Sequence, residues 1–316
     1  METTKSSQII LSDLNTVQDI RQSTAWCSFL EKKGWKIFTT TKGTNVLVLN
    51  FKIGALSKIQ RAHDLDTDEL KEIEVLLKSQ GAWFILVEPG VNQNYTNLLS
   101  LGFIPSTQLM SPTATVIIDL KLAPDVLWND LSQSARYSVN RSKREQTRLE
   151  IIREPSRAQL EHFYTLYEAT TKVQNFHKIS FEDMFLRISL FKANAFLILA
   201  YDKDNQLLNG RVYLANKNCV WYLFGGTSDL GRGKNKAGYE LQWESFLYFK
   251  NLGFEYLDLE GVYDGRLNTV RKDWEGLSYY KHKFGGTLVE YPLPCVKYLS
   301  PVFKIINKIS FGKFSL

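Results

Sequence analysis

The chain has 316 residues, more than one typical hydrophobic core can fill, and its 44% hydrophobic and 13% aromatic content excludes an intrinsically disordered protein. The formal net charge is +6, and no apolar run approaches the roughly 18–20 residues needed to cross a bilayer. The three cysteines are scattered and odd in number, which argues against a disulfide framework or a metal site and indicates reduced thiols. Residues 1–6 lack the basic and apolar parts of an export signal, so we expect a cytoplasmic protein.

The first half of the chain is predicted to contain a helix that leads into a buried strand. Its expected elements, in order, are the helix 14–33, the strands 36–41 and 45–53, the helix 66–79 and the strand 82–87. Gly81 ends the second helix, as glycine commonly does, and a strand this apolar is usually central in a sheet. Glu88 follows the strand, seven residues after the glycine.

A basic segment, 129–149, connects the two halves and is predicted to form one helix. One face carries residues at helical spacing, namely Leu131, Ala135, Val139 and Ser142. Basic side chains cover most of the remainder, namely Arg136, Arg141, Lys143, Arg144 and Arg148. Such a face is ordinarily a solvated surface. The alternative is a surface that contacts phosphates, either of RNA or of a pyrophosphate-linked substrate.

The second half repeats the pattern of the first. Its expected elements are the helices 157–173 and 180–192, the strands 195–201, 207–215 and 219–224, the helix 236–249 and the strand 254–259. Gly253 ends the last helix, and Glu260 again lies seven residues after the glycine. The repeat predicts a mixed α/β chain of the α+β class, with domains at residues 1–150 and 151–296 and a tail at 297–316.

The tail is both basic and apolar. It contains no acidic residue and four lysines, Lys297, Lys304, Lys308 and Lys313. Such a segment could lie peripherally on an anionic membrane surface. It could equally be a terminal helix docked on the protein, with its lysines in solvent.

A lysine lies between aromatic side chains and just before two glycines in the segment 279–286, YYKHKFGG. A partly desolvated ammonium can bind a phosphate or stabilise an oxyanion, and the glycines would let a substrate approach the backbone. If the segment is extended, Lys283 shares a face with Lys281, and His282 points the other way. The structural alternative is a lysine whose stem covers a strand edge.

Two further residues are candidates for the same chemistry. Asp258 lies where a strand ends, on the face opposite its leucine neighbours, and could orient or deprotonate an amine. The alternative is a carboxylate on a polar surface. Tyr222 is followed by the pair Gly225-Gly226 and is expected to line a cleft between the domains.

Several short motifs occur in a fixed order along the chain. They are Ala25-Trp26, Ser111-Pro112-Thr113-Ala114-Thr115, the basic helix from Arg136 to Lys143, Trp221 to Ser228, Asp258 to Val262, and Tyr280 to Gly286. This succession, from about residue 20 to residue 290, resembles the FemABX family, the non-ribosomal peptidyltransferases that build peptidoglycan interpeptide bridges. Tyr280-Lys281 stands where the family has the phenylalanine-lysine pair of its active site.

The resemblance implies two tandem GNAT-like acyltransferase domains of the short type that lacks a helical-hairpin arm. It implies transfer of an amino acid from aminoacyl-tRNA to the stem-peptide amine of a peptidoglycan precursor, either lipid II or UDP-MurNAc-pentapeptide. Aminoacyl-tRNA is then a co-substrate, and the reaction needs no cofactor, metal or covalent nucleophile. We expect a monomer.

With this resemblance, the candidate residues can be assigned to three roles. Those expected to be catalytic are Lys281, Asp258 and Tyr280. Those expected to bind the precursor are Tyr222, Lys36, Arg61, Arg136 and Lys283. Those expected to contact tRNA are Arg141, Arg144, Arg232 and Lys234. The last two lie in a glycine-rich loop that could also be a plain flexible turn.

Two other functions stay open at this point. One is a GNAT-type acyltransferase that uses acyl-CoA, although Asn235 occupies the first glycine position of the pyrophosphate loop that would begin at Arg232. The other is a non-catalytic protein that binds RNA or a membrane through the basic helix and tail.

Overall fold

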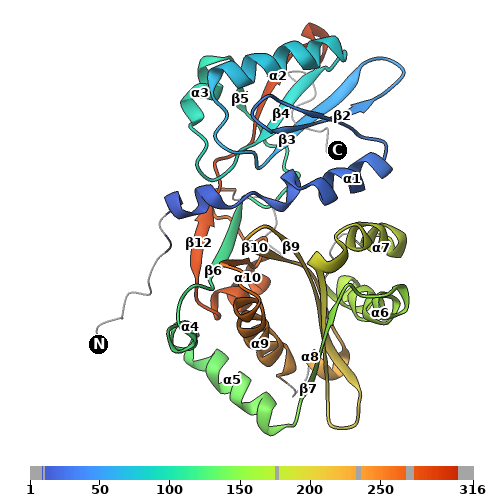
Figure 1. Cartoon of the computed structure of the whole chain (residues 1–316), viewed down its shortest axis with the longest axis vertical. Helices are drawn as coiled ribbons and strands as arrows, with labels where there is room; N and C mark the ends of the chain where they lie inside the picture. The colour runs from blue at the N-terminus through green and yellow to red at the C-terminus, as the bar shows by residue number, and fades with distance from the viewer. Residues whose placement is uncertain (1–8, 10, 175–177, 233–235, 268–273, 305–316) are drawn as a thin grey trace. The chain divides into compact units, whose positions relative to one another are not determined.

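The computed structural model describes residues 9, 11–174, 178–232, 236–267 and 274–304, which form two compact units (Figure 1). The first unit comprises residues 10–113 and 290–316, and the second comprises residues 1–9 and 114–289. Each unit contains its own sheet with helices packed on it, so the predicted α+β class is confirmed.

The sheet of the first unit has the strand order β1-β2-β3-β4-β13-β5. Its strands are β1 (Lys36–Thr39), β2 (Asn45–Asn50), β3 (Ala55–Gln60), β4 (Phe84–Glu88), β5 (Ile104–Pro105) and β13 (Cys295–Tyr298). Its helices are η1 (Leu11–Thr16), η2 (Ile20–Gln22), α1 (Thr24–Lys32), α2 (Thr67–Ser79) and α3 (Tyr95–Ser100). Among the described strands of this sheet, β3 and β4 alone pair in parallel, and α2 connects them.

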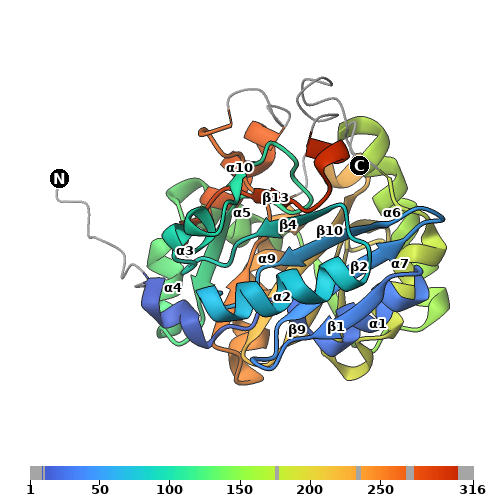
Figure 2. The same cartoon turned by 90° about the horizontal axis from the view of Figure 1, so that it is seen from above.

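The helix α2 covers one face of this sheet (Figure 2). It begins after Asp66, whose carboxylate accepts hydrogen bonds from two backbone N–H groups of the first turn and so caps the helix. Leu70, Ile73 and Leu77 recur at helical spacing and are buried against the strands, which is what fixes the helix to the sheet.

The sheet of the second unit has the strand order β12-β6-β11-β10-β9-β8-β7. Its strands are β6 (Ala114–Asp119), β7 (Arg148–Arg153), β8 (Ala195–Tyr201), β9 (Leu207–Asn216), β10 (Cys219–Thr227), β11 (Tyr256–Asp258) and β12 (Thr287–Glu290). Its helices are α4 (Pro124–Asp130), α5 (Gln133–Arg144), α6 (Arg157–Gln174), α7 (Phe181–Ser189), η3 (Lys192–Asn194), α8 (Asp229–Arg232), α9 (Ala237–Asn251) and α10 (Glu275–His282). The helices α5 and α9 lie on one face of the sheet, and α6 and α7 lie on the other (Figure 1).

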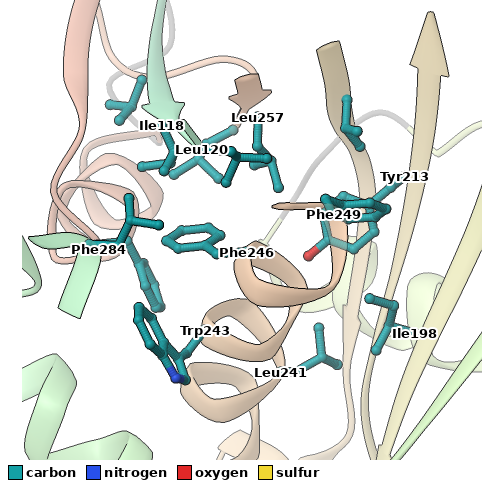
Figure 3. Packing of buried hydrophobic residues seen from close by; sticks show 14 of the residues in the cluster. Ile118, Leu120, Ile198, Tyr213, Leu241, Trp243, Phe246, Phe249, Leu257 and Phe284 are labelled. Carbon is teal, nitrogen blue, oxygen red and sulfur yellow. The ribbon is translucent and has the colours of Figure 1, made fainter. Parts of the chain in front are cut away.

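The core of the second unit is built around α9 (Figure 3). Trp243, Phe246 and Phe249 are buried on different sides of this helix, because it lies between α5 and the sheet. Phe246 points toward Phe284, with ring centroids 6.1 Å apart, and Phe249 packs edge-on against Tyr213 of β9 at 5.0 Å. Truncating one such buried ring to alanine typically costs about 3–5 kcal/mol.

The predicted repeat between the two halves is confirmed. In the second unit α9 connects β10 to β11, and these strands pair in parallel as β3 and β4 do in the first unit. Gly81 and Gly253 follow the two helices with φ of +68° and +85°. Because this left-handed conformation carries little penalty only for glycine, the two residues end the helices as predicted.

The boundary between the units differs from the predicted one at residue 150. The chain divides at Ala114, because β6 pairs with β11 and places Ile118 opposite Leu257. The strand β13 pairs with β4 and β5, so residues 290–296 belong to the first unit and not to the second.

Two predicted helices are interrupted. The segment 129–149 forms the end of α4, then α5, then the start of β7, which contains Arg148. Ser132 causes the break, since its side chain accepts a hydrogen bond from the backbone N–H of Ala135 and caps α5. The segment 14–33 is divided in the same way, and Ser23 caps α1. The predicted apolar face of the basic helix is confirmed, because Leu131, Ala135, Val139 and Ser142 are all buried.

The start of the predicted tail belongs to the fold of the first unit. Lys297 lies in β13 and forms an ion pair with Glu74 of α2, and the ring of Phe303 stacks on that of Trp83. Residues 305–316 lie outside the described residues. Within the described ranges, no helix is long and apolar enough to span a membrane.

Candidate active site

The side chain of Lys281 is buried in the second unit, with 5% of its surface exposed. Its Nζ donates hydrogen bonds to the backbone carbonyl oxygens of Glu260, at 2.9 Å, and Gly261, at 2.8 Å. The residue lies in the helix α10 and not in an extended segment. The expectation that Lys283 shares its face is therefore wrong. In a helix, two residues that are two positions apart in the sequence point in directions about 200° apart.

The helix α10 is held in place by contacts at its middle and just after its end. The hydroxyl of Ser278 accepts a hydrogen bond from the backbone N–H of Tyr263, at 2.6 Å, and donates one to the carbonyl of Trp274, at 2.7 Å. Phe284, just after the helix, is buried in the core. These contacts fix the helix against the segment that follows β11, which supplies the carbonyl partners of Lys281.

Burial lowers the pKa of Lys281 from the usual 10.5 to about 8. The carboxylates of Glu260 and Asp258 act in the opposite direction, and the charge of Arg211 adds to the lowering. A lysine with such a pKa exchanges its proton near neutral pH, as a group that takes part in proton transfer must.

Asp258 ends β11 and is buried, so the alternative of a carboxylate on a polar surface is wrong. Its Oδ1 accepts hydrogen bonds from the hydroxyl of Thr115 and from the backbone N–H of Glu260, at 2.7 Å. Glu260 has a φ of +58°, which is strained for a residue with a side chain. The carboxylate of Asp258 thus holds the turn whose carbonyl oxygens contact Lys281.

Tyr280 belongs to a second buried group beside Lys281. Its hydroxyl donates a hydrogen bond to the carbonyl of Gly238, at 2.8 Å, and accepts one from the guanidinium of Arg211. Arg211 also donates to the Gly238 carbonyl, at 2.8 Å, and to the side-chain oxygen of Gln242. These bonds connect β9, α9 and α10, and they turn the Tyr280 hydroxyl toward the protein.

Tyr222 of β10 lies beside both cations. Its ring centroid is 5.8 Å from Nζ of Lys281 and 5.0 Å from Cζ of Arg211. A bulge in β10 between Tyr222 and Phe224 lets the tyrosine fold over Gly225, where a Cβ atom would lie 2.0 Å from the Tyr222 hydroxyl. A side chain at position 225 would therefore displace the Tyr222 ring.

Sequence reasoning missed Arg211 and Gln242. Both are buried, and Arg211 stands in the middle of the strand β9, which is otherwise mostly apolar. A charge in such a strand is costly unless it is paired, so its presence in the sequence was a usable signal.

The remaining predicted residues of the second unit have other partners. Arg136 donates hydrogen bonds to the carbonyls of Asn129 and Leu131, which is a structural role at the break between α4 and α5. Two predicted tRNA contacts form local ion pairs, Arg141 with Glu145 and Arg232 with Asp229. Arg144 is exposed, and Lys283 lies over the ring of Tyr279, with 4.4 Å between Nζ and the centroid. Lys234 lies outside the described residues.

The two predicted phosphate ligands, Lys36 and Arg61, belong to the first unit. Lys36 is exposed on β1. Arg61 is buried, donates hydrogen bonds to the carbonyls of Pro89 and Pro112, and lies 3.7 Å from the ring centroid of Tyr291. The guanidinium of Arg61 is thus already bound by its own unit.

Among the described residues, no group of His, Cys, Asp or Glu side chains is placed to hold a metal ion. Of the predicted residues, four lie together in the second unit, namely Lys281, Asp258, Tyr280 and Tyr222. The structure adds Arg211 to this group.

Comparison with known proteins finds one family model and several solved structures that are similar to this chain. The model of the FemAB family matches residues 192–309, which include Tyr222, Asp258 and Lys281. The crystal structure of FemX is 16% identical to the chain, with a TM-score of 0.79, and the match covers 95% of this chain and 98% of FemX. A search of curated proteins finds no match.

Two other solved structures share the fold. L-PGS from Bacillus licheniformis is 12% identical, with a TM-score of 0.59 and coverage of 90% of this chain and 96% of that one. A conserved protein of unknown function from Bacteroides thetaiotaomicron is 16% identical, with a TM-score of 0.60 and coverage of 92% and 98%. Two tandem α+β units, each with its own sheet, are thus the fold that this chain shares with FemX. The FemAB family model thus matches residues 192–309 of this chain, and the chain shares the fold of FemX over nearly its whole length.

Proposed function

We propose that the protein transfers an amino acid from aminoacyl-tRNA to the stem-peptide amine of a peptidoglycan precursor, and so forms part of an interpeptide bridge. The family match and the FemX fold support this reaction class. The single observation that carries the proposal is the buried ammonium of Lys281, which has a lowered pKa and lies inside the matched region.

The reaction is aminolysis of an ester. The amine nitrogen of the acceptor attacks the ester carbonyl carbon, and a tetrahedral oxyanion forms. The bond from that carbon to the ribose oxygen of the tRNA then breaks, and the proton lost by the amine ends on the ribose hydroxyl. The protein must align the amine with the ester, stabilise the oxyanion and relay the proton.

Lys281 can perform the last two tasks. An ammonium has three N–H donors, and the carbonyls of Glu260 and Gly261 use two of them. The third can donate to the oxyanion in a buried setting where a charge-assisted bond is strong. With a pKa of about 8, the same group can give a proton to the leaving ribose oxygen and recover one from the amine.

The neighbouring side chains position this lysine. Asp258 holds the turn that supplies the two carbonyls, and its charge favours the ammonium form of Lys281. Tyr280 and Arg211 fix α10 to α9, and the ring of Tyr222 borders the two cations.

For the substrates, we propose that the exposed side chain of Lys36 contacts the phosphates of the precursor. The exposed side chain of Arg144 is the corresponding proposal for tRNA. Arg61 and Arg136 are bound to backbone carbonyls and take no part in this assignment.

The test is a transfer assay with the purified chain. The protein is incubated with a mixture of charged tRNAs and, in separate reactions, UDP-MurNAc-pentapeptide or lipid II, and the acceptor is analysed by mass spectrometry. We expect a mass increase of one amino-acid residue that requires charged tRNA, with deacylated tRNA as the control. An unchanged mass of both acceptors would refute the proposal.

A further inference from the structure

Three aromatic rings form a stack at the surface of the first unit. The rings of Phe51 and Trp83 are nearly parallel, at 14°, with centroids 5.6 Å apart, and those of Trp83 and Phe303 are nearly parallel, at 13°, with centroids 4.3 Å apart. The stack joins the turn between β2 and β3, the start of β4 and the segment after β13.

The backbone around the central ring makes the stack rigid. The carbonyl of Trp83 accepts hydrogen bonds from the backbone N–H groups of Leu299, at 2.9 Å, and Ser300, at 3.0 Å. Its own N–H donates to the carbonyl of Ala55, at 2.9 Å. The indole lies across Gly54, where a Cβ atom would be 2.0 Å from Nε1, and Gly54 has a φ of +81°. The turn and the chain after β13 are thus both fixed to Trp83.

Large apolar side chains around the stack remain in solvent. Ile53 is 82% exposed, Val302 is 61% exposed, and even the stacked ring of Phe51 is 50% exposed. We call this surface, formed by residues 51–54, Trp83 and residues 302–304, the aromatic face. Exposed apolar side chains that gather on one surface of a folded unit usually mark a surface that is covered in use.

The charge on this face has one sign. Lys52 and Lys304 are exposed beside the apolar side chains. The sequence has no acidic residue at positions 50–54 or 299–304. The nearby lysine of β13, Lys297, already pairs with Glu74.

We propose that the aromatic face docks on the surface of a membrane that contains anionic lipids. Exposed aliphatic side chains at a turn can enter the boundary between headgroups and acyl chains, and aromatic rings favour that depth. Lysines at the rim then meet the anionic headgroups. A protein partner with an ordinary mixed surface would leave the uniformly positive rim without complementary charges.

The inference goes beyond the proposed reaction and does not depend on it. Docking would bring the protein to the surface where lipid-linked acceptors reside, but binding to vesicles requires neither charged tRNA nor an acceptor. Lys281→Met should therefore bind vesicles as the wild type does, whatever its transfer activity.

The first test is co-sedimentation of the full chain with phosphatidylcholine vesicles, with and without phosphatidylglycerol. We expect binding only when phosphatidylglycerol is present, and a loss of affinity on the order of tenfold or more in the double variant Ile53→Ser, Val302→Ser. Lys304→Glu should weaken binding most at low salt. Val75→Ser is the matched control, because Val75 is 71% exposed but lies on α2. Equal binding of the double variant and the wild type would overturn the proposal.

The second test reports on the face directly. The cysteines Cys27, Cys219 and Cys295 are all buried, so a thiol introduced by Ile53→Cys can be labelled selectively with an environment-sensitive fluorophore. We expect the emission to shift to the blue when phosphatidylglycerol vesicles are added, and no shift for the label at Val75→Cys. A blue-shifted emission at position 53 before vesicles are added would show that the protein itself covers the face, and would overturn the proposal.

Discussion

The carboxyl-terminal ends of the two parallel strand pairs, β3/β4 and β10/β11, have the same backbone plan and different chemistry. In the first unit, Glu88 ends β4 and accepts hydrogen bonds from the backbone N–H groups of Met110 and Ser111, from the Ser111 hydroxyl and from the amide of Gln60. In the second unit, the turn after β11 gives two carbonyl oxygens to Lys281. We call the first end closed, because the Glu88 carboxylate is fully bonded, and the second end open, because Lys281 has three N–H donors and the two carbonyls use only two of them.

Glu88 and Lys281 are both buried, so the different balance of their pKa shifts depends on the charged and polar groups around each of them. Burial acts to raise the pKa of Glu88, but the charge of Arg61 and the hydrogen bonds from Gln60, Ser111 and Met110 lower it overall. For Lys281 burial outweighs the nearby carboxylates, and the pKa falls to about 8. One copy of the repeat therefore stabilises its ion, and the other destabilises its ion. A stabilised ion suits a structural role, and a destabilised one suits proton transfer.

The largest expected effect on stability is at the closed end, that of β4 in the first unit, where Glu88 lies. Glu88→Ala removes the shared acceptor of four donors, three of them in buried hydrogen bonds, and we expect it to lower the free energy of unfolding by about 3–5 kcal/mol. Urea denaturation measures the change. Glu72→Ala, which removes an exposed carboxylate bonded to Thr41, should cost less than about 1 kcal/mol. If Glu88→Ala lost as little unfolding free energy as Glu72→Ala, the structural role of Glu88 would be contradicted.

At the open end, where Lys281 lies, the free energy of unfolding should depend on pH. Because Lys281 has a lower pKa in the folded chain than in the unfolded chain, the unfolded state binds more protons between pH 8 and 10.5. The free energy of unfolding should therefore rise with pH in this window, by up to about 3 kcal/mol relative to Lys281→Met. Urea denaturation of both proteins across the window measures this difference. Parallel pH profiles would contradict the lowered pKa.

A smaller effect is expected at the second buried group. Tyr280→Phe keeps the ring but removes the hydroxyl that bonds to Gly238 and Arg211, so we expect a decrease in kcat of roughly fivefold, about 1 kcal/mol, with KM unchanged. Tyr279→Phe is the control, since Tyr279 is exposed. A change in KM alone would show that the Tyr280 hydroxyl contacts substrate and does not position α10.

Local patterns predicted the repeat and the candidate lysine. The glycines at 81 and 253 marked the helix ends, and periodicity identified the buried face of α5, because both signals depend on adjacent residues. The helix α10 was missed, since its few residues beside Gly285 fit a strand as well as a helix. The unit boundary depends on pairing between β6 and β11, which lie far apart in the sequence and leave no local signal.

The central claim is that the open end of the repeat carries the chemistry, and Lys281→Met tests it most directly in the transfer assay. Lys250→Met is the matched control, because Lys250 also donates to two backbone carbonyls, those of Leu120 and Lys121, in the same unit. We predict that Lys281→Met folds and loses transfer by at least about a hundredfold, while Lys250→Met retains it. A wild-type rate for Lys281→Met, or an equal loss in both variants, would contradict the account.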